Sequence, residues 1–224
     1  MSLPPEQPDL SAVPLFPLPN VVLFPRAVLP LHIFEERYRT MTAEVLDGHR
    51  QVAMALLRPG WERDYYSRPA IEPVVCVGTI LSHEKLPDGK YNFLLQGHTR
   101  ARVTREHGER PYRVAQLERI PEINDDESGL EEERERLRRA FRPAMLGATP
   151  VGRQFKQLMA GCLRTADIAD LLAFNYIEDV WLKQSLLADP DVRRRVRRIV
   201  EAVEANQPAL QLAYLRDAAD PQLN

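Results

Sequence analysis

Residues 13–38 of the 224-residue chain are VPLFPLPNVVLFPRAVLPLHIFEERY. Apolar pieces of strand length alternate here with prolines at positions 14, 17, 19, 25 and 30. Proline lacks a backbone N–H, so a central strand could not accept this many missing donors. The stretch therefore predicts a strand over 15–18, a turn at Pro19-Asn20, and a further bent strand formed by the pieces 21–24 and 27–31.

The residues that follow continue the β pattern and add one helix. Apolar side chains at helical spacing (Tyr38, Met41, Val45, Leu46) predict a helix over 34–47. An Asp88-Gly89 pair between two apolar runs indicates a hairpin. Further strand candidates are 51–57, 74–85, 91–96, 99–105 and 112–120. Up to about residue 121 the sequence predicts about six strands and one helix, in an irregular antiparallel barrel or sandwich.

The second half of the sequence is typical of a helical bundle. A polar, acidic stretch at 121–128 suits a linker, and Ser128-x-x-Glu131 after it resembles a capping box. Thr165 can cap a later helix, and Asp189-Pro190 can begin the last one. The apolar stripes are 130/137/141/145, 151/155/158/162, 168/171/172 and 192/196/199/203. We divide the chain into a β-rich lobe (1–122), a helical bundle (123–210) and a tail (211–224).

Composition places the chain among ordinary globular proteins. Hydrophobic residues make up 44% of the chain, charged residues 28%, and the net charge is -2, which favours neither nucleic acid nor an acidic membrane. Cys76 and Cys162 stand alone in apolar surroundings, as buried thiols in a reducing compartment do. No signal peptide and no apolar run of roughly 20 residues is present. We expect a cytoplasmic protein that does not enter membranes.

The sequence offers no recognisable catalytic or metal-binding motif. A phosphate-binding loop requires GxxxxGK[ST], whereas the one Gly-Lys pair, Gly89-Lys90, precedes Tyr91 within the predicted hairpin. The five histidines form no HxxxH pattern, and no CxxC pair is present. His83 could approach His98 across the hairpin, although solvated polar side chains on an open sheet face explain both better. We expect no catalytic residue, no metal and no cofactor.

Two features of the sequence are candidate binding surfaces. The first is a loop at 58–68 with three aromatic residues, Trp61, Tyr65 and Tyr66. Aromatic side chains in a polar loop either contact a partner or fold back into the core, and the sequence does not decide between the two. We hypothesise that these three residues contribute to a peptide- or protein-binding surface.

The second feature is an arginine-rich helix near residue 195. Arg193, Arg194, Arg195, Arg197 and Arg198 surround its apolar stripe. They could contact phosphates of a nucleic acid. They could instead form salt bridges with the Glu-rich helix at 131–135, and the near-neutral total charge favours this second interpretation.

Three blocks of the sequence resemble the N-terminal domain of Lon proteases. They are PLPNVVLFP at 17–25 with Leu-Pro-Leu at 29–31, the run from VGTI (77–80) through LPDG (86–89) to GHTRARV (97–103), and KQSLL at 183–187 before the arginine-rich helix. The blocks occur in order over nearly all of the chain. Gly78 and Gly97 within them would allow tight bends or close backbone approach in a curved sheet.

The resemblance implies an α+β fold, with a PUA-like β-rich pseudo-barrel lobe followed by a helical bundle. It also implies a non-catalytic module that recognises proteins or unfolded polypeptide segments. Full-length Lon enzymes carry a phosphate-binding loop and a Ser–Lys pair in later domains, and neither motif is found here. The alternative interpretation is an RNA- or nucleotide-binding PUA-like module, although nucleic acid is the less favoured partner.

Overall fold

The computed structural model describes residues 9–108, 110–141 and 163–205. The chain divides into two compact units, Met1–Pro121 and Glu122–Asn224, called here the β unit and the helical unit. The elements of the β unit are β1 Val13–Leu18, β2 Val28–Ile33, α1 Glu36–Leu46, β3 Gln51–Leu56, the 3-10 turn η1 Trp61–Asp64, β4 Val74–Lys85, β5 Tyr91–His107 and β6 Arg113–Arg119.

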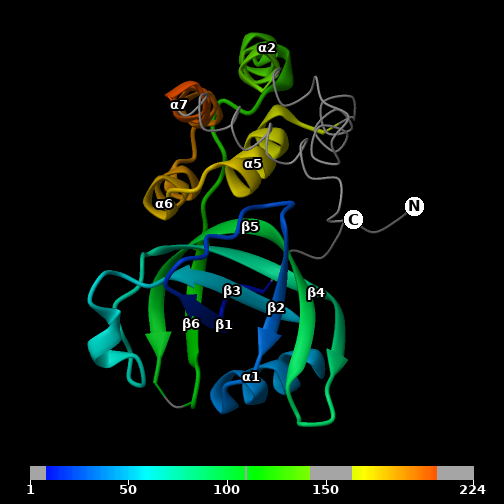
Figure 1. Cartoon of the computed structure of the whole chain (residues 1–224), viewed down its shortest axis with the longest axis vertical. Helices are drawn as coiled ribbons and strands as arrows, with labels where there is room; N and C mark the ends of the chain where they lie inside the picture. Colours follow the sequence, from blue (N-terminus) through cyan, green and yellow to red (C-terminus); the bar gives the residue numbers. More distant parts are fainter. Residues whose placement is uncertain (1–8, 109, 142–162, 206–224) are drawn as a thin grey trace, which may run out of the picture. The chain divides into compact units, whose positions relative to one another are not determined.

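Five strands of the β unit close into a small barrel (Figure 1). Closure is possible because β6 pairs antiparallel both with β1 and with the second half of β5. Alternate side chains of a strand point to the same side, which here is the barrel interior. This core is lined by Val13, Leu15, Ala53, Ala55, Val75, Val77, Ala101, Ala115 and Leu117. The small alanine side chains suit the narrow interior of such a barrel.

The sheet is mixed, which corrects the expected antiparallel arrangement. β1 and β3 pair in parallel, whereas the other neighbouring strands are antiparallel. A parallel pair needs a crossover between its strands, and β2 and α1 supply it. The expected α+β class, with a β-rich barrel-like lobe and a helical part, is confirmed.

Gly97 marks the point where another segment of chain crosses β5. The residues 21–24, expected to be part of a strand, form no strand and instead lead over β5. The Arg26 N–H donates to the Gly97 carbonyl, and the Gly97 N–H donates to that of Ala27. A Cβ at Gly97 would lie 2.2 Å from the carbonyl oxygen of Phe24. The expectation of a close backbone approach at Gly97 is confirmed.

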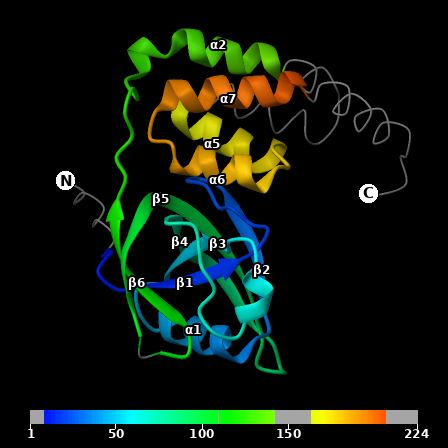
Figure 2. The same ribbon diagram turned by 90° about the vertical axis from the view of Figure 1, so that its left-hand side faces the viewer.

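Helix α1 and the β4–β5 hairpin also follow the sequence prediction. In Figures 1 and 2, α1 lies across one end of the barrel, and its residues Tyr38, Met41 and Val45 are buried. The hairpin turns at Gly89, which has a φ of 80° and donates its N–H to the Leu86 carbonyl. A positive φ favours glycine, so the Asp-Gly signal led to the correct turn.

We expect Gly97→Ala to lower the free energy of unfolding by about 1–3 kcal/mol, because the new methyl group must displace the backbone at Phe24. Urea denaturation followed by circular dichroism measures this change. Gly108→Ala is the matched control, since a Cβ at Gly108 meets nothing within 4 Å. Equal stability of the two variants would contradict the importance of the crossing.

The helical unit contains four described α-helices and one short turn. They are η2 Glu127–Gly129, α2 Glu131–Ala140, α5 Thr165–Tyr176, α6 Val180–Ala188 and α7 Val192–Ala205. Helix α7 packs against α2 and α5, and α6 packs against α5 (Figure 2). The expected apolar positions 145, 151, 155, 158 and 162 and the tail at 211–224 lie outside the described residues. No helix in the described ranges is long and apolar enough to cross a bilayer.

The helix starts differ from those that the sequence predicted. Ser128 does not cap α2; it lies in η2, and its N–H is accepted by Asp126. Thr165 is the first residue of α5, and its N–H and hydroxyl both donate to the carboxylate of Glu127, at 2.6 and 2.9 Å. This cap is 38 residues away in sequence, so local patterns could not reveal it.

The stretch 121–128, expected to be a linker, is largely bound to the helical unit. Glu122 lies 2.5 Å from the guanidinium of Arg195, which is fully buried (0% exposed) and also 3.4 Å from Asp170. Ile123 forms a β-bridge with Asp191. A buried guanidinium needs acidic partners to offset the loss of its hydration, and the supposed linker supplies one.

The arginine-rich helix α7 forms ion pairs, but mostly with partners that were not expected. Arg194 pairs with Asp189 at 2.6 Å, and Arg193 approaches the Glu-rich helix, with 4.0 Å to Glu133. Burial by itself would raise the pKa of Asp189. Hydrogen bonds from Arg194 and from the backbone N–H of Asp191 nevertheless hold it below the ordinary value. The predicted salt bridge to the Glu-rich helix is therefore found for Arg193, whereas Arg194, Arg195 and Arg198 pair with other carboxylates.

We expect Arg195→Met to destabilise the protein by about 3–5 kcal/mol, because the buried Asp170 and the partly buried Glu122 both lose their ion pair with Arg195. Arg197→Met on the same helix is the control, since Arg197 is exposed and should shift stability by about 0.5 kcal/mol or less. Chemical denaturation of both variants at neutral pH gives the comparison. If Arg195→Met left the free energy of unfolding unchanged, the ion pairs of Arg195 would not contribute to stability.

Candidate functional site

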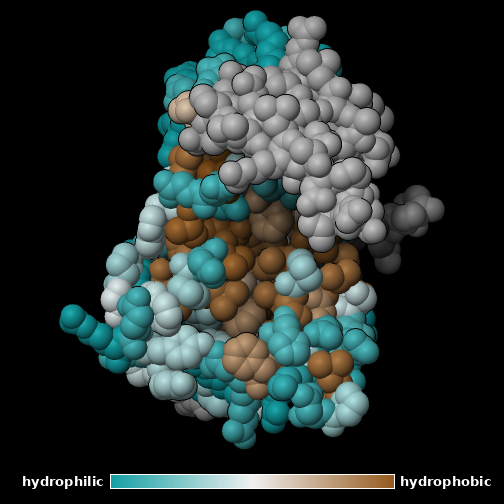
Figure 3. All heavy atoms as spheres, in the orientation of Figure 1, coloured by the Kyte–Doolittle hydropathy of each residue, from teal (hydrophilic) through white to brown (hydrophobic). Residues whose placement is uncertain are grey.

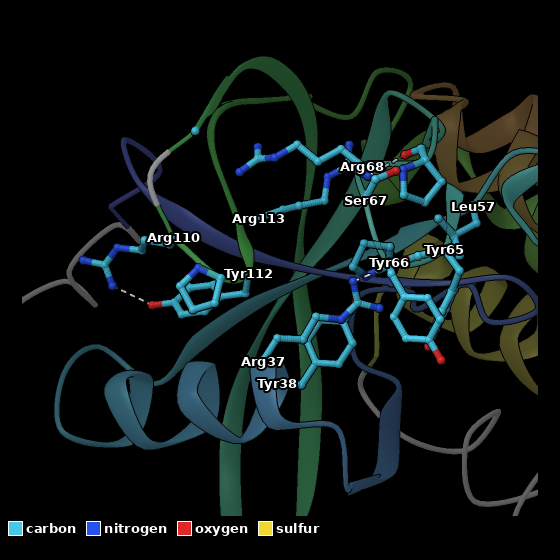
Figure 4. Close-up of a pocket in the computed structure, with 14 residues that line it drawn as sticks. Arg37, Tyr38, Leu57, Tyr65, Tyr66, Ser67, Arg68, Arg110, Tyr112 and Arg113 are labelled. Carbon is cyan, nitrogen blue, oxygen red and sulfur yellow. Dashed lines mark hydrogen bonds between the residues drawn. The ribbon is translucent and has the colours of Figure 1, made fainter. Parts of the chain in front are cut away.

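A pocket of about 400 Å³ opens on the β unit, lined mainly by arginine and tyrosine side chains. Figure 4 shows them around the hollow: Arg37 and Tyr38 rise from α1, Tyr65 and Tyr66 belong to the loop after η1, and Arg110, Tyr112 and Arg113 come from the start of β6 and the residues before it. We call it the arginine–tyrosine pocket. Its arginines and tyrosines are Arg37, Arg68, Arg110, Arg113, Tyr38, Tyr65, Tyr66 and Tyr112.

Arg37 forms one wall of this pocket, on the first turn of α1. Its guanidinium carbon lies 4.6 Å from the ring centre of Tyr38 and 4.9 Å from that of Tyr65, within cation–π range. The guanidinium also donates to the backbone carbonyl of Tyr65 and pairs with Glu35 at 3.0 Å. The hydroxyl of Tyr65 donates to Glu35 as well. Residues some 30 positions apart are thus fixed together.

The three aromatic residues singled out in the loop have different environments. Trp61 is half-buried, packs edge-on against Tyr65 at 5.4 Å and does not line the pocket. Tyr65 points back to α1 and is half-buried. Tyr66 is 91% exposed. The sequence left open whether these rings face a partner or fold back: Tyr65 folds back, whereas Tyr66 faces outward.

The opposite wall of the pocket comes from β6 and the residues before it. Arg113 is buried, donates two hydrogen bonds to Glu106 at 2.8 and 2.5 Å, and a third to the carbonyl of Pro69. Arg68 is exposed and donates to the carbonyl of His107 at 3.1 Å. Arg110 pairs with Glu44 and also donates to the hydroxyl of Tyr112.

The hydroxyls of Tyr38, Tyr65 and Tyr112 stay protonated at neutral pH, because the pKa of each is raised above its ordinary value. Burial raises the pKa of Tyr38 to about 12. Burial first, and then a hydrogen bond to a glutamate, raises the pKa of Tyr65 and of Tyr112. The charged groups that line the hollow are therefore guanidinium groups, with carboxylates behind them.

Most of this pocket could not be predicted from the sequence. Tyr38 was assigned to the buried face of a helix, which is correct, but Arg37, Arg110 and Arg113 had no distinguishing pattern. They come from segments up to 76 residues apart, brought together by the barrel. A single sequence carries no signal for such a grouping.

A second surface lies on the outer side of β2, β5 and β4, and we call it the open sheet face. Cross-strand neighbours there form successive rows: Pro30–Leu94–Ser82 and His32–Asn92–Glu84. Several large apolar side chains are exposed on or beside it, namely Val28, Leu94, Leu81 (50%) and Phe34 (60%). Figure 3 shows hydrophobic residues gathered on the side of the β unit that carries β2.

Polar side chains cross this face in a hydrogen-bonded row. His32 Nδ1 lies 2.7 Å from Asn92 Oδ1, and Asn92 Nδ2 donates to Glu84 at 3.5 Å. Phe34 stacks beside His32, with 6.1 Å between ring centres. A shallow hollow of about 450 Å³ follows the row. The face thus offers apolar contact together with fixed hydrogen-bonding groups.

The pair of histidines considered as a possible site is not brought together by the strand register. His83 pairs with Phe93, whereas His98 lies at the irregularity where Val77 pairs with Thr99 and Gly78 with Gly97. Within the described ranges, no three His, Cys, Asp or Glu side chains are placed to hold a metal ion.

The fold of the chain is that of Lon N-terminal domains. A Lon N-terminal domain protein from Xanthomonas campestris superposes with a TM-score of 0.62 at 22% identity, covering 85% of this chain and 98% of that one. The N-terminal domain of a Mycobacterium avium complex Lon protease gives a TM-score of 0.64 at 15% identity, covering 87% and 98%.

Sequence comparison identifies the family. The model of the ATP-dependent protease La (LON) substrate-binding domain matches residues 12–205, so the chain belongs to this family. Lon protease 2 of Sorangium cellulosum is 31% identical over 206 residues, and the Lon protease of Desulfosudis oleivorans is 23% identical over 202. These alignments cover 89% and 90% of this chain but 25% of each relative, so the chain spans about a quarter of their length.

We expect Tyr65→Phe to loosen the loop at 58–73, because Glu35 loses the hydroxyl that ties the loop to α1. Amide hydrogen exchange of residues 60–68 should become faster. Tyr66→Phe removes a hydroxyl from the adjacent, exposed ring and serves as control. Unchanged exchange in Tyr65→Phe, or equal acceleration in both variants, would contradict the anchoring role of Tyr65.

Proposed function

We propose that this chain is a non-catalytic recognition module that binds unfolded polypeptide segments. The observation that carries the proposal is the open sheet face, with exposed apolar side chains around a row of fixed polar groups. Membership in a substrate-binding domain family supports it. Exposed apolar clusters on a protein surface commonly mark binding sites for other chains.

An extended segment fits the geometry of this face. Strand β2 pairs only with β5, so it forms an edge of the sheet in the described part of the chain. An extended chain lying along this edge would place every second side chain over Val28, Leu94 and Phe34. Pro30 lacks an N–H donor, and we therefore assign the main attraction to side-chain burial.

The aromatic loop contributes in two ways in this proposal. Tyr66 presents its ring to the partner. Trp61 and Tyr65 hold the loop in position from behind, since Trp61 packs on Tyr65 and Tyr65 is tied to Glu35. The earlier hypothesis of three equivalent contact residues thereby becomes one contact residue and two supporting ones.

The same proposal includes the absence of catalysis and a cytoplasmic location. The arginines and tyrosines of the pocket offer no nucleophile paired with a general base. Two cysteines in 224 residues form no disulfide framework, which suits a reducing compartment. A connection to proteolysis would come through delivery of the bound segment to a protease.

The second candidate function is a nucleic-acid-binding module. The ion pairs of α7 make it less favoured, because they already engage its arginines. Arg195 is buried, while Arg193 and Arg194 pair with Glu133 and Asp189. Phosphate contacts would have to replace these pairs. Binding of a single-stranded 20-nucleotide RNA that weakens steeply with salt would favour this candidate instead.

We expect Leu81→Ser/Leu94→Ser to weaken binding of reduced, carboxamidomethylated α-lactalbumin by about tenfold or more, because two apolar contacts are lost. Fluorescence anisotropy with the labelled, permanently unfolded protein measures the affinity. Trp181→Ser is the control, since Trp181 is similarly exposed but belongs to the helical unit. Equal weakening in both variants would point to non-specific adhesion.

A further inference from the structure

We infer that the arginine–tyrosine pocket binds a carboxylate group of the recognised polypeptide, next to an apolar or aromatic side chain. The carboxylate is either the C-terminus of the partner chain or an Asp or Glu side chain. The inference rests on the proposed function, because it specifies which polypeptide segments the module takes.

The first argument is the charge balance of the pocket. Its four guanidinium groups face three carboxylates, those of Glu35, Glu44 and Glu106, and Glu106 is shared between Arg113 at 2.5 Å and Arg68 at 3.9 Å. Among the described groups this leaves one positive charge without a compensating negative charge. Attraction of an anion is stronger in a partly enclosed hollow than in open water, because the effective dielectric constant is lower. A single carboxylate would complete the balance.

The second argument is the supply of hydrogen-bond donors. A guanidinium carries five N–H donors in a planar fork that matches the two oxygens of a carboxylate. Arg113 and Arg37 each use at least three N–H donors in contacts within the protein, so their guanidinium groups are held in place. Arg68 is exposed and, in the described part of the chain, makes one hydrogen bond, to the carbonyl of His107, and one long ion pair of 3.9 Å, to Glu106. We therefore assign the main contact with the carboxylate to Arg68.

The third argument is the aromatic rim. Tyr66 is 91% exposed and stands edge-on to Tyr65, with 5.2 Å between ring centres. Its ring offers a flat apolar contact beside the arginines. The volume of about 400 Å³ suits a group of small-molecule size, such as one or two residues of a chain, and not a folded surface.

These features favour a carboxylate over a phosphate. A phosphate monoester carries close to two negative charges at neutral pH, which would exceed the single uncompensated positive charge. The hydroxyls of Tyr38, Tyr65 and Tyr112 are neutral and add no charge of their own. Competition by inorganic phosphate is therefore part of the test.

The test uses the full chain and three fluorescein-labelled octapeptides that share a Leu-Phe end. The first has a free C-terminal carboxylate, the second is amidated, and the third is amidated but has Asp before the Leu-Phe pair. We expect the first or third peptide to bind at least about tenfold more tightly than the second, since charged hydrogen bonds are lost without the carboxylate. Which of the two binds more tightly identifies the source of the carboxylate.

Variants then assign the contact. Arg68→Gln and Tyr66→Ala should each weaken binding of the carboxylate peptide by about fivefold or more. Only Arg68→Gln should also abolish the preference for this peptide over the amidated one. Arg63→Gln is the matched control, because Arg63 is an exposed arginine of the same loop that does not line the pocket. Thermal unfolding of each variant verifies that the fold is intact.

Equal affinity for all three peptides, or equal weakening by Arg63→Gln, would overturn the inference. Displacement of the carboxylate peptide by inorganic phosphate at lower concentration than by acetate would reassign the pocket to phosphate and overturn it as well. If unfolded α-lactalbumin still binds while the carboxylate has no effect, the pocket inference fails and the proposed function stands. If neither binds, both fail.

Discussion

The architecture of the β unit depends on the close passage of one backbone segment over another at Gly97. The first half of strand β5 pairs with β2, and its second half pairs with β6 to close the barrel. The chain that leads from β1 to β2 crosses β5 between these halves and exchanges backbone hydrogen bonds with Gly97. No side chain larger than hydrogen fits there, because the carbonyl of Phe24 occupies the space.

This crossing also determines where both candidate surfaces form. It delivers β2 to the outer edge of the sheet, where Pro30 and His32 meet Leu94 and Asn92. It then directs the chain into α1, whose first turn carries Arg37 to the pocket. The apolar face and the basic pocket are therefore consequences of one folding constraint, although they use different side chains.

The sequence predicted the features that local patterns encode. The helix at 34–47 and the turn at Gly89 depend on residues a few positions apart, and both were correct. The caps and ion pairs of the helical unit were not predictable in this way, because Glu122 and Arg195 are 73 residues apart. The adjacent Tyr65 and Tyr66 illustrate the same limit within the candidate site. Only Tyr65 meets Glu35, and that contact depends on how α1 is placed.

The anchoring of Glu122 has a consequence for how the chain can be cut. Ile120 donates its backbone N–H to the carbonyl of Arg100 in the β unit, and Glu122 is held by Arg195 in the helical unit. Pro121 is the single residue between these attachments. A protease must draw several residues of its substrate into an extended form, and exposed, unattached loops allow this most easily. The joint between the units offers no such length, so we expect the chain to resist cleavage there.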